Sequence, residues 1–276
     1  VSYQYNAGGA VLQTIFTDAS GHASFSLETA TIIAAVFIVL YTVLAGLLSV
    51  VYTDVGNGII MTIVLLVAFP ILWIKAGGWD GIQMAFIQQG VPEKLDFTGR
   101  FSPIQLINYI LPPFLLILGD ANMYQRFSAA KTRAGITRAT LVLVLAVLLI
   151  EGLIVATAAV SASLVPDAAN GRHILIYVAA TQLPMLLGGL FFATIIGIII
   201  STADSYLLVP ATTLIKDIYL TYINPNAEEK RIVLYSRLLV IALGFAAWIL
   251  SRGFANSPGF FERALYAYTI YGAAIT

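Results

Sequence analysis

The sequence predicts an all-α protein, a polytopic bundle of membrane-spanning helices. Of its 276 residues, 59% are hydrophobic and only 10% are charged, and the mean hydropathy is +0.91, whereas a soluble domain carries about 25% charged residues. The hydrophobic residues gather in runs of about 20, the length that an α-helix needs to cross a bilayer. These Leu, Ile, Val and Ala runs lack the alternation of a membrane β-barrel.

Seven segments are predicted to span the membrane within a single transmembrane domain, residues 1–276. They are residues 29–51, 56–75, 104–126, 136–162, 184–209, 232–251 and 260–276. Residues 1–16 are compatible with the tail of an earlier span. Because the chain begins with Val1 and stops inside an apolar segment, we expect it to be a fragment of a longer protein.

Charge and cysteine content exclude several classes of partner. The formal net charge is zero, so nothing favours a nucleic-acid partner. Cysteine is absent, which removes disulfides and thiolate metal sites.

Basic residues in the loops predict the orientation. Eight lysines and arginines lie in or beside two loops on one side, residues 126–138 and 216–237, against six in the opposite loops. We expect the two basic loops to be cytoplasmic.

Carboxylates at membrane depth are costly and therefore mark candidate functional sites. Asp120, Glu151 and Asp204 lie inside predicted spans, and Asp54 lies at a span boundary. Glu151 stands alone among apolar residues, so an interhelical hydrogen bond or a protonated carboxyl is favoured there over a proton relay.

The span 184–209 carries a polar face in the stretch 200-ISTADSYLL-208. Ser201, Asp204 and Ser205 have helical spacing and share one side, and Thr202 can reach the same cluster. Converging oxygen atoms suit a hard cation such as Na⁺, because they replace its hydration shell. Alternatively, the hydroxyls bond back to carbonyls one turn earlier or across a helix interface, which explains the hydroxyls but not Asp204.

The span 104–126 is predicted to be broken. Pro112 and Pro113 remove backbone donors, and 119-GDAN-122 favours helix formation poorly. Broken helices near the midplane are how many transporters build binding sites. A proline kink followed by a polar helix end is the alternative.

Three motifs resemble those of the sodium/solute symporter family. They are 201-STADSYLLVPATTLIKDIY-219, with its Asp-Ile-Tyr ending, 119-GDANMYQRFSAAKT-132, with its Gln-Arg tract, and 41-YTVLAGLLSVVYTDVGNGIIM-61. In the last, Ala45 replaces the first glycine of the family's pair and Asn57 replaces the usual glutamine. The resemblance implies a partial LeuT-type fold of two inverted repeats, with the first repeat incomplete and the second nearly complete.

The same resemblance implies sites and an activity. Sodium would bind Ser201, Thr202 and the Ile198 carbonyl, and a second cation would bind Asp54, Asp204 and Ser205, with H⁺ as a further candidate for coupling. The solute would contact Pro113, Leu116, Ile117, Asp120, Tyr268 and Tyr271. The implied activity is not enzymatic: it is symport of a sugar, amino acid, carboxylate or vitamin across a plasma membrane, in bacteria the inner one, by alternating access.

Two other functions stay open from the sequence. An intramembrane aspartyl protease would pair Asp120 with Asp204, although Ile117 stands where its Gly-x-Gly-Asp motif has glycine. A transporter-like sensory domain is the other alternative.

Overall fold

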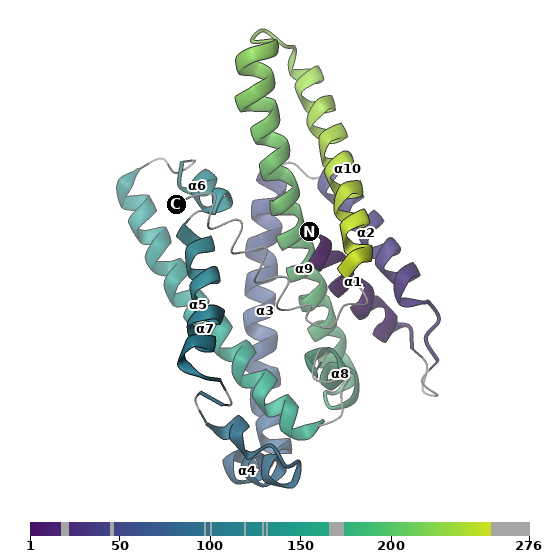
Figure 1. Cartoon of the computed structure of the whole chain (residues 1–276), viewed down its shortest axis with the longest axis vertical. Helices are drawn as coiled ribbons and strands as arrows, with labels where there is room; N and C mark the ends of the chain where they lie inside the picture. Colours follow the sequence, from purple (N-terminus) through teal and green to yellow (C-terminus); the bar gives the residue numbers. More distant parts are fainter. Residues whose placement is uncertain are drawn as a thin grey trace. The chain divides into compact units, whose positions relative to one another are not determined.

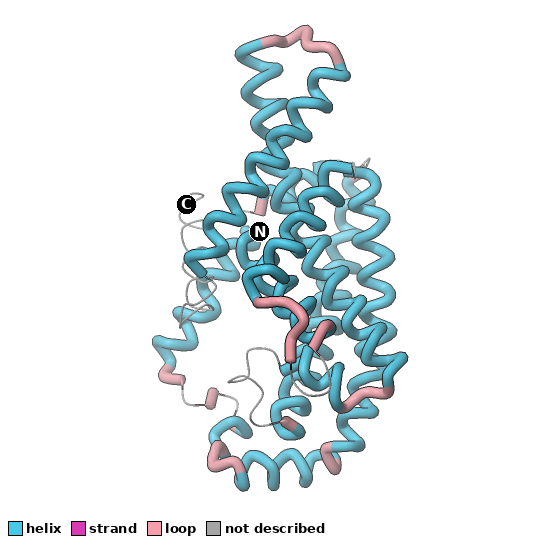
Figure 2. Tube along the Cα trace, turned by 90° about the vertical axis from the view of Figure 1, so that its right-hand side faces the viewer, coloured by secondary structure: helices cyan, strands magenta, loops and turns pink. Residues whose placement is uncertain are grey.

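The computed structural model describes residues 1–17, 22–44, 47–96, 98–99, 101–118, 120–128, 130, 132–165 and 174–254. All regular secondary structure in these residues is helical (Figure 2), apart from an isolated β-bridge between Thr17 and Ala23. The prediction of an all-α protein is confirmed.

The described residues divide into two compact units. The first comprises residues 1–60 and 192–254, and the second comprises residues 61–191, each with the gaps given above. The boundary falls inside helices α3 (Leu47–Lys75) and α9 (Met185–Thr213). Each of these two helices therefore contributes residues to both units.

The helices of the first unit are labelled in Figure 1. Besides its parts of α3 and α9 it contains α1 (Ser2–Ile15), α2 (Leu27–Leu44), the π-helix η3 (Leu214–Ile223) and α10 (Glu229–Phe254). Helices α1, α2 and α10 pack against one another, and α10 also contacts η3.

Small residues allow α1 and α2 to approach closely, as is common between membrane helices. Gly9 lies so near α2 that a Cβ atom there would stand 2.8 Å from both the backbone N and the Cα of Thr31. Ala30 and Ala34 on α2 are buried. On the other side of α1, the buried Tyr5 hydroxyl donates to the carbonyl of Gly244 over 3.4 Å.

The second unit is described by itself. It contains α4 (Gly78–Gln88), the 3₁₀-helix η1 (Pro92–Leu95), α5 (Pro103–Leu118), α6 (Ala121–Ser128), α7 (Arg133–Leu164) and α8 (Ile174–Thr181). Helix α7 contacts α4 and α8. Its first turn is capped by Thr132, whose hydroxyl accepts the Gly135 N–H over 3.0 Å, a favoured residue type at this position.

Five helical segments of the described chain are long and apolar enough to cross a membrane. They are Leu27–Leu44, Val50–Lys75, Arg133–Leu164, Met185–Ile223 and Glu229–Gly253. Five of the seven predicted spans correspond to these segments. Residues 260–276, the seventh predicted span, lie outside the described residues.

The boundary predicted near Asp54 is wrong. Helix α2 ends at Leu44 and α3 begins at Leu47, so Asp54 lies within a continuous helix. Gly56 and Gly58 do not interrupt α3, because a helix in lipid keeps its backbone hydrogen bonds internal even where propensity is low.

The third predicted span is broken, but not at its prolines. Helix α5 continues through Pro112 and Pro113 and ends at Leu118, and α6 begins at Ala121. The fifth span is longer than predicted, because α9 passes through Pro210 to Thr213 and continues as η3. A π-helix of ten residues is unusual, since most are single-turn bulges.

Candidate functional site

The polar face predicted for the fifth span is formed in α9. Ser201 and Thr202 are half-buried, whereas Asp204 is only 1% exposed and Ser205 is 9% exposed. Their neighbours Ala203 and Leu207 are buried as well. A carboxylate therefore lies in the interior of the first unit, where its charge requires polar partners.

The hydroxyls of Ser201 and Thr202 are uncommitted. Within the part of the chain that the structure describes, neither forms a side-chain hydrogen bond. Thr212, farther along the same helix, donates to the Leu208 carbonyl over 2.8 Å, as the alternative interpretation expects of helical hydroxyls. That interpretation therefore describes Thr212 but not Ser201 and Thr202.

Asp204 has a partner that the sequence analysis missed. The Thr42 hydroxyl, on α2, lies 2.5 Å from Asp204 Oδ1 and 2.8 Å from the carbonyl of Ile38. Thr42 is 1% exposed. Its place in the Tyr-Thr motif was visible in the sequence, but a contact across 162 residues leaves no local pattern.

Helix α3 brings two more polar side chains to this region of α9. Asp54 is near enough to Asp204 for the two carboxylates to interact electrostatically. Asn57, one turn along α3, donates from Nδ2 to the carbonyl of Gly197 over 3.4 Å. A Cβ atom on Gly197 would lie 3.0 Å from the Asn57 side chain, so glycine is what permits this approach.

The cluster offers the ligands that a hard cation prefers. Asp54 on α3 interacts electrostatically with Asp204 on α9, which shares its helix with the hydroxyls of Ser201, Thr202 and Ser205. Oxygen ligands of this kind replace the water shell of such an ion. The carbonyl of Ile198 keeps a second lone pair even when it accepts a helical hydrogen bond. Two neighbouring carboxylates in a medium of low dielectric repel each other, and a bound cation relieves that repulsion.

The predicted solute-contacting residues lie in the second unit or outside the described chain. Pro113 and Leu116 are half-buried in α5, and Ile117 is in the same helix. Asp120 lies in the break, where its carbonyl accepts the Tyr124 N–H over 3.2 Å and so starts α6. Tyr268 and Tyr271 are outside the described residues.

Glu151 lies on the exposed side of α7. Among the described residues it has no hydrogen-bond partner. The expected interhelical hydrogen bond is therefore not formed in this part of the chain.

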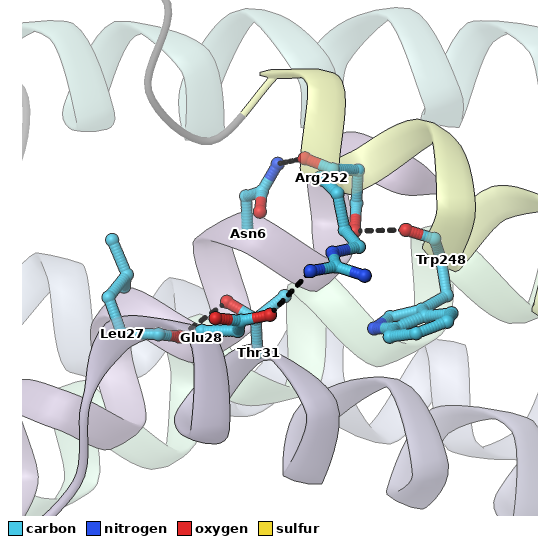
Figure 3. Close-up of a pocket in the computed structure, with 7 residues that line it drawn as sticks. Asn6, Leu27, Glu28, Thr31, Trp248 and Arg252 are labelled. Carbon is cyan, nitrogen blue, oxygen red and sulfur yellow. Dashed lines mark hydrogen bonds and ion pairs between the residues drawn. The ribbon is translucent and has the colours of Figure 1, made fainter.

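A separate cavity of about 190 Å³ opens between α1, α2 and α10 (Figure 3). Its Arg252 guanidinium lies 3.0 Å from the Glu28 carboxylate and 5.5 Å from the centre of the Trp248 ring. Asn6 donates to the carbonyl of Ser251 over 3.2 Å. None of the predicted site residues lines this cavity.

Comparison with known proteins identifies the family. A model of the sodium:solute symporter family matches residues 2–276. The chain belongs to this family. The resemblance drawn from the three motifs is therefore confirmed, and the chain is a member of a family of transporters and an integral membrane protein.

Named relatives of this symporter-family chain are bacterial. It is 24% identical to the sodium/proline symporter of Escherichia coli, covering 90% of this chain and 50% of the relative. It is 30% identical to the osmoregulated proline transporter OpuE of Bacillus subtilis, and the match covers 86% of this chain and 48% of the relative. It is 25% identical to the sodium/pantothenate symporter of E. coli, covering 90% and 51%. The chain thus spans about half the length of the curated relatives it matches.

A solved structure supports the fold. The structure of a Na⁺-coupled sialic acid symporter in its substrate-bound outward-open state is similar to this one, with a TM-score of 0.65 and 18% sequence identity. The match covers 94% of this chain and 58% of the symporter chain. The LeuT-type helix bundle that the motifs imply is therefore confirmed as the fold.

Proposed function

We propose that the complete protein performs sodium-coupled symport of a small solute by alternating access. The observation that carries this proposal is the pair of uncommitted hydroxyls on Ser201 and Thr202, which lie three and two residues before the buried Asp204 in α9. A hydroxyl without a helical acceptor is available to a cation. Sodium at these oxygens would link α9 to whatever other element supplies the remaining ligands.

We place a second cation at Asp54, Asp204 and Ser205. Asp204 and Ser205 are buried and Asp54 interacts electrostatically with Asp204. A cation with one positive charge offsets part of the negative charge that two carboxylates would bring to this interior.

The solute of this protein is proposed to carry a carboxylate. Proline, pantothenate and sialic acid, which the names of the relatives give as solutes, differ in size and polarity but each has a carboxyl group. Pro113, Leu116, Ile117 and Asp120 of the broken segment, with Tyr268 and Tyr271, are the residues proposed to line its site.

The driving force follows from the charge of sodium. One charge that moves through about 100 mV supplies about 2.3 kcal/mol, and the concentration gradient adds to it. Coupling requires that sodium bind one arrangement of the transporter more tightly than the other.

The test is uptake by the full-length protein in sodium and in choline medium, with proline, pantothenate and sialic acid as solutes. Substituting Ser201→Ala together with Thr202→Ala is expected to raise the sodium concentration for half-maximal uptake at least tenfold. Ser236→Ala is the control, because its hydroxyl on α10 donates to the Ile232 carbonyl over 2.9 Å. Sodium dependence that is unchanged in the double variant would refute the assignment.

The orientation is also a proposal, with loops 126–138 and 216–237 in the cytoplasm. Residues 1–276 contain no cysteine, so a thiol introduced here is the one labelling site in this part of the protein. In intact cells, an impermeant maleimide is expected to label Thr98→Cys and not Asn226→Cys. The reverse labelling would invert the topology.

The family match gives no support to the protease or the sensory domain. Asp120 and Asp204, the pair that a protease would need, belong to different units of the described chain.

A further inference from the structure

The contact between Thr42 and Asp204 joins two helices inside the first unit. Thr42 is on α2 and Asp204 is on α9, and both side chains are 1% exposed. Their neighbours along α2 and α9, Ile38, Ala203 and Leu207, are buried and apolar. In the described chain, the only side-chain hydrogen bond of Asp204 comes from Thr42.

The Thr42 hydroxyl has two acceptors within hydrogen-bonding distance. Thr42 has one hydroxyl proton and two nearby acceptors, the Asp204 carboxylate at 2.5 Å and the Ile38 carbonyl at 2.8 Å. The shorter contact is to Asp204, and hydrogen bonds to a charged acceptor are shorter and stronger than those between neutral groups. The Ile38 carbonyl lies one turn back on α2 and keeps the hydroxyl in its rotamer.

Thr31 shows the ordinary arrangement of a buried threonine in this unit. Thr31, on the same helix and 6% exposed, donates to the Leu27 carbonyl over 2.8 Å. This back-bond is the ordinary arrangement of a helical threonine. Thr42 makes the same back-bond and in addition contacts a carboxylate on another helix. Its hydroxyl therefore links α2 to α9.

We propose that Thr42 is a positioning residue for cation binding, fixing Oδ1 of Asp204 so that Oδ2 is presented to the ion together with Asp54 and Ser205. This inference rests on the proposed symport function and extends it to a residue outside the ligand set. A side chain already held in its binding geometry loses less conformational entropy when the ion arrives. Without the hydroxyl, the buried carboxylate loses its hydrogen-bond donor and its fixed orientation, and the cation binds more weakly.

The test compares Thr42→Val, which keeps the shape and removes the hydroxyl, with Thr42→Ser, which keeps the hydroxyl. In the full-length transporter, Thr42→Val is expected to raise the sodium concentration for half-maximal uptake about tenfold. The solute KM and the maximal rate at saturating sodium are expected to stay within about twofold of the wild-type values. Thr42→Ser is expected to restore most of the sodium affinity, and Thr31→Val is the control that removes a buried hydroxyl from the same helix.

A second measurement follows cation binding without transport. Sodium is expected to raise the melting temperature of the detergent-solubilised wild type and of Thr42→Ser, and to do so for Thr42→Val only at about tenfold higher concentration. A double-mutant cycle with Asp204→Asn is expected to be non-additive, because the two side chains act through one contact.

Each outcome decides between the two proposals. If the wild type shows no sodium dependence in uptake or melting, the proposed function fails, and this inference fails with it. If the wild type depends on sodium and Thr42→Val has unchanged or increased sodium affinity, only the role of Thr42 is refuted. It is also refuted if Thr42→Ser is as impaired as Thr42→Val. If Thr42→Val and Thr42→Ala both fail to accumulate in the membrane while Thr31→Val accumulates, Thr42 serves folding and the inference is wrong.

Discussion

Replacing Gly9 by alanine tests the close contact between α1 and α2. A Cβ atom at this position would lie 2.8 Å from both the backbone N and the Cα of Thr31. Because these are backbone atoms, no rotation of a side chain relieves the overlap, and one helix must move. Gly152, on α7, is the matched control, since a Cβ there meets nothing within 4 Å.

The magnitude follows from two opposing effects. Overpacking in a tightly packed interior costs about 1–3 kcal/mol, and a clash with backbone places Gly9→Ala near the upper end of that range. Alanine favours a helix over glycine by about 1 kcal/mol. The net loss is therefore about 2 kcal/mol for Gly9→Ala, whereas Gly152→Ala is expected to gain roughly 0.5–1 kcal/mol.

Thermal unfolding in detergent, followed by intrinsic tryptophan fluorescence, measures the difference. With a shift of about 2–4 °C per kcal/mol for a chain of this size, Gly9→Ala is expected to melt about 4–8 °C below the wild type. Gly152→Ala is expected to melt at or slightly above it. A Gly9→Ala protein that melts at the wild-type temperature would show that the α1–α2 interface is looser than the structure indicates.

Three further substitutions probe contacts of different kinds by the same melting assay. Gly244→Ala places a Cβ 2.5 Å from Val39 Cγ2, which is the end of a side chain that can move, so we expect a cost of about 1 kcal/mol, smaller than at Gly9; an equal or larger loss would contradict this reasoning. Arg252→Ala removes the ion pair between Arg252 and Glu28, whose side chains are 60% and 64% exposed. We expect the free energy of unfolding to change by under about 1 kcal/mol, with any loss reduced by salt. A larger loss that does not respond to salt would contradict this expectation. Thr132→Ala removes the cap of α7 and is expected to cost about 1 kcal/mol, with Thr132→Ser close to wild type; equal loss in both would exclude capping as the cause.

Most membrane-spanning helices could be predicted from the sequence, because the requirement for about 20 apolar residues leaves a long and unambiguous signal. The ends of the helices could not. The polar residues between the apolar runs 29–51 and 56–75 predict a boundary near Asp54, and in water Gly56 and Gly58 would favour one by exposing the backbone to competing hydrogen bonds. In lipid those competitors are absent, so α3 continues through both glycines. Helix α5 likewise continues through Pro112 and Pro113 to Leu118, and Asp120 precedes the start of α6.

Only the part of the candidate cation cluster that lies on one helix could be predicted from the sequence, because helical spacing relates residues of the same helix. Ser201, Asp204 and Ser205 share a face of one helix, and that follows from the period of 3.6 residues. The partner of Asp204 does not, since Thr42 is 162 residues away. Thr42 lies in the motif that begins at Tyr41, but its hydroxyl could equally form a back-bond within its own helix, so no local pattern identifies its partner.

The serine and threonine hydroxyls discussed above fall into two groups, those satisfied within their own helix and those that are not. Those of Thr31 and Thr212 are satisfied by carbonyls of their own helices, and their loss leaves only a carbonyl that already has a helical partner. Those of Ser201 and Thr202 have no such acceptor among the described residues, and that of Thr42 is shared with a carboxylate.

Sodium coupling needs hydroxyls that are not committed to a carbonyl of their own helix. An ion can change the balance between two arrangements only through ligands whose contacts differ between them. A hydroxyl bonded within its own helix travels with that helix and contributes equally to both arrangements. A tenfold preference for one arrangement corresponds to about 1.4 kcal/mol, which is within reach of one hydrogen bond to a charged group. Loss of the contact between Thr42 and Asp204 is therefore large enough, under the proposed function, to account for the tenfold shift expected for Thr42→Val.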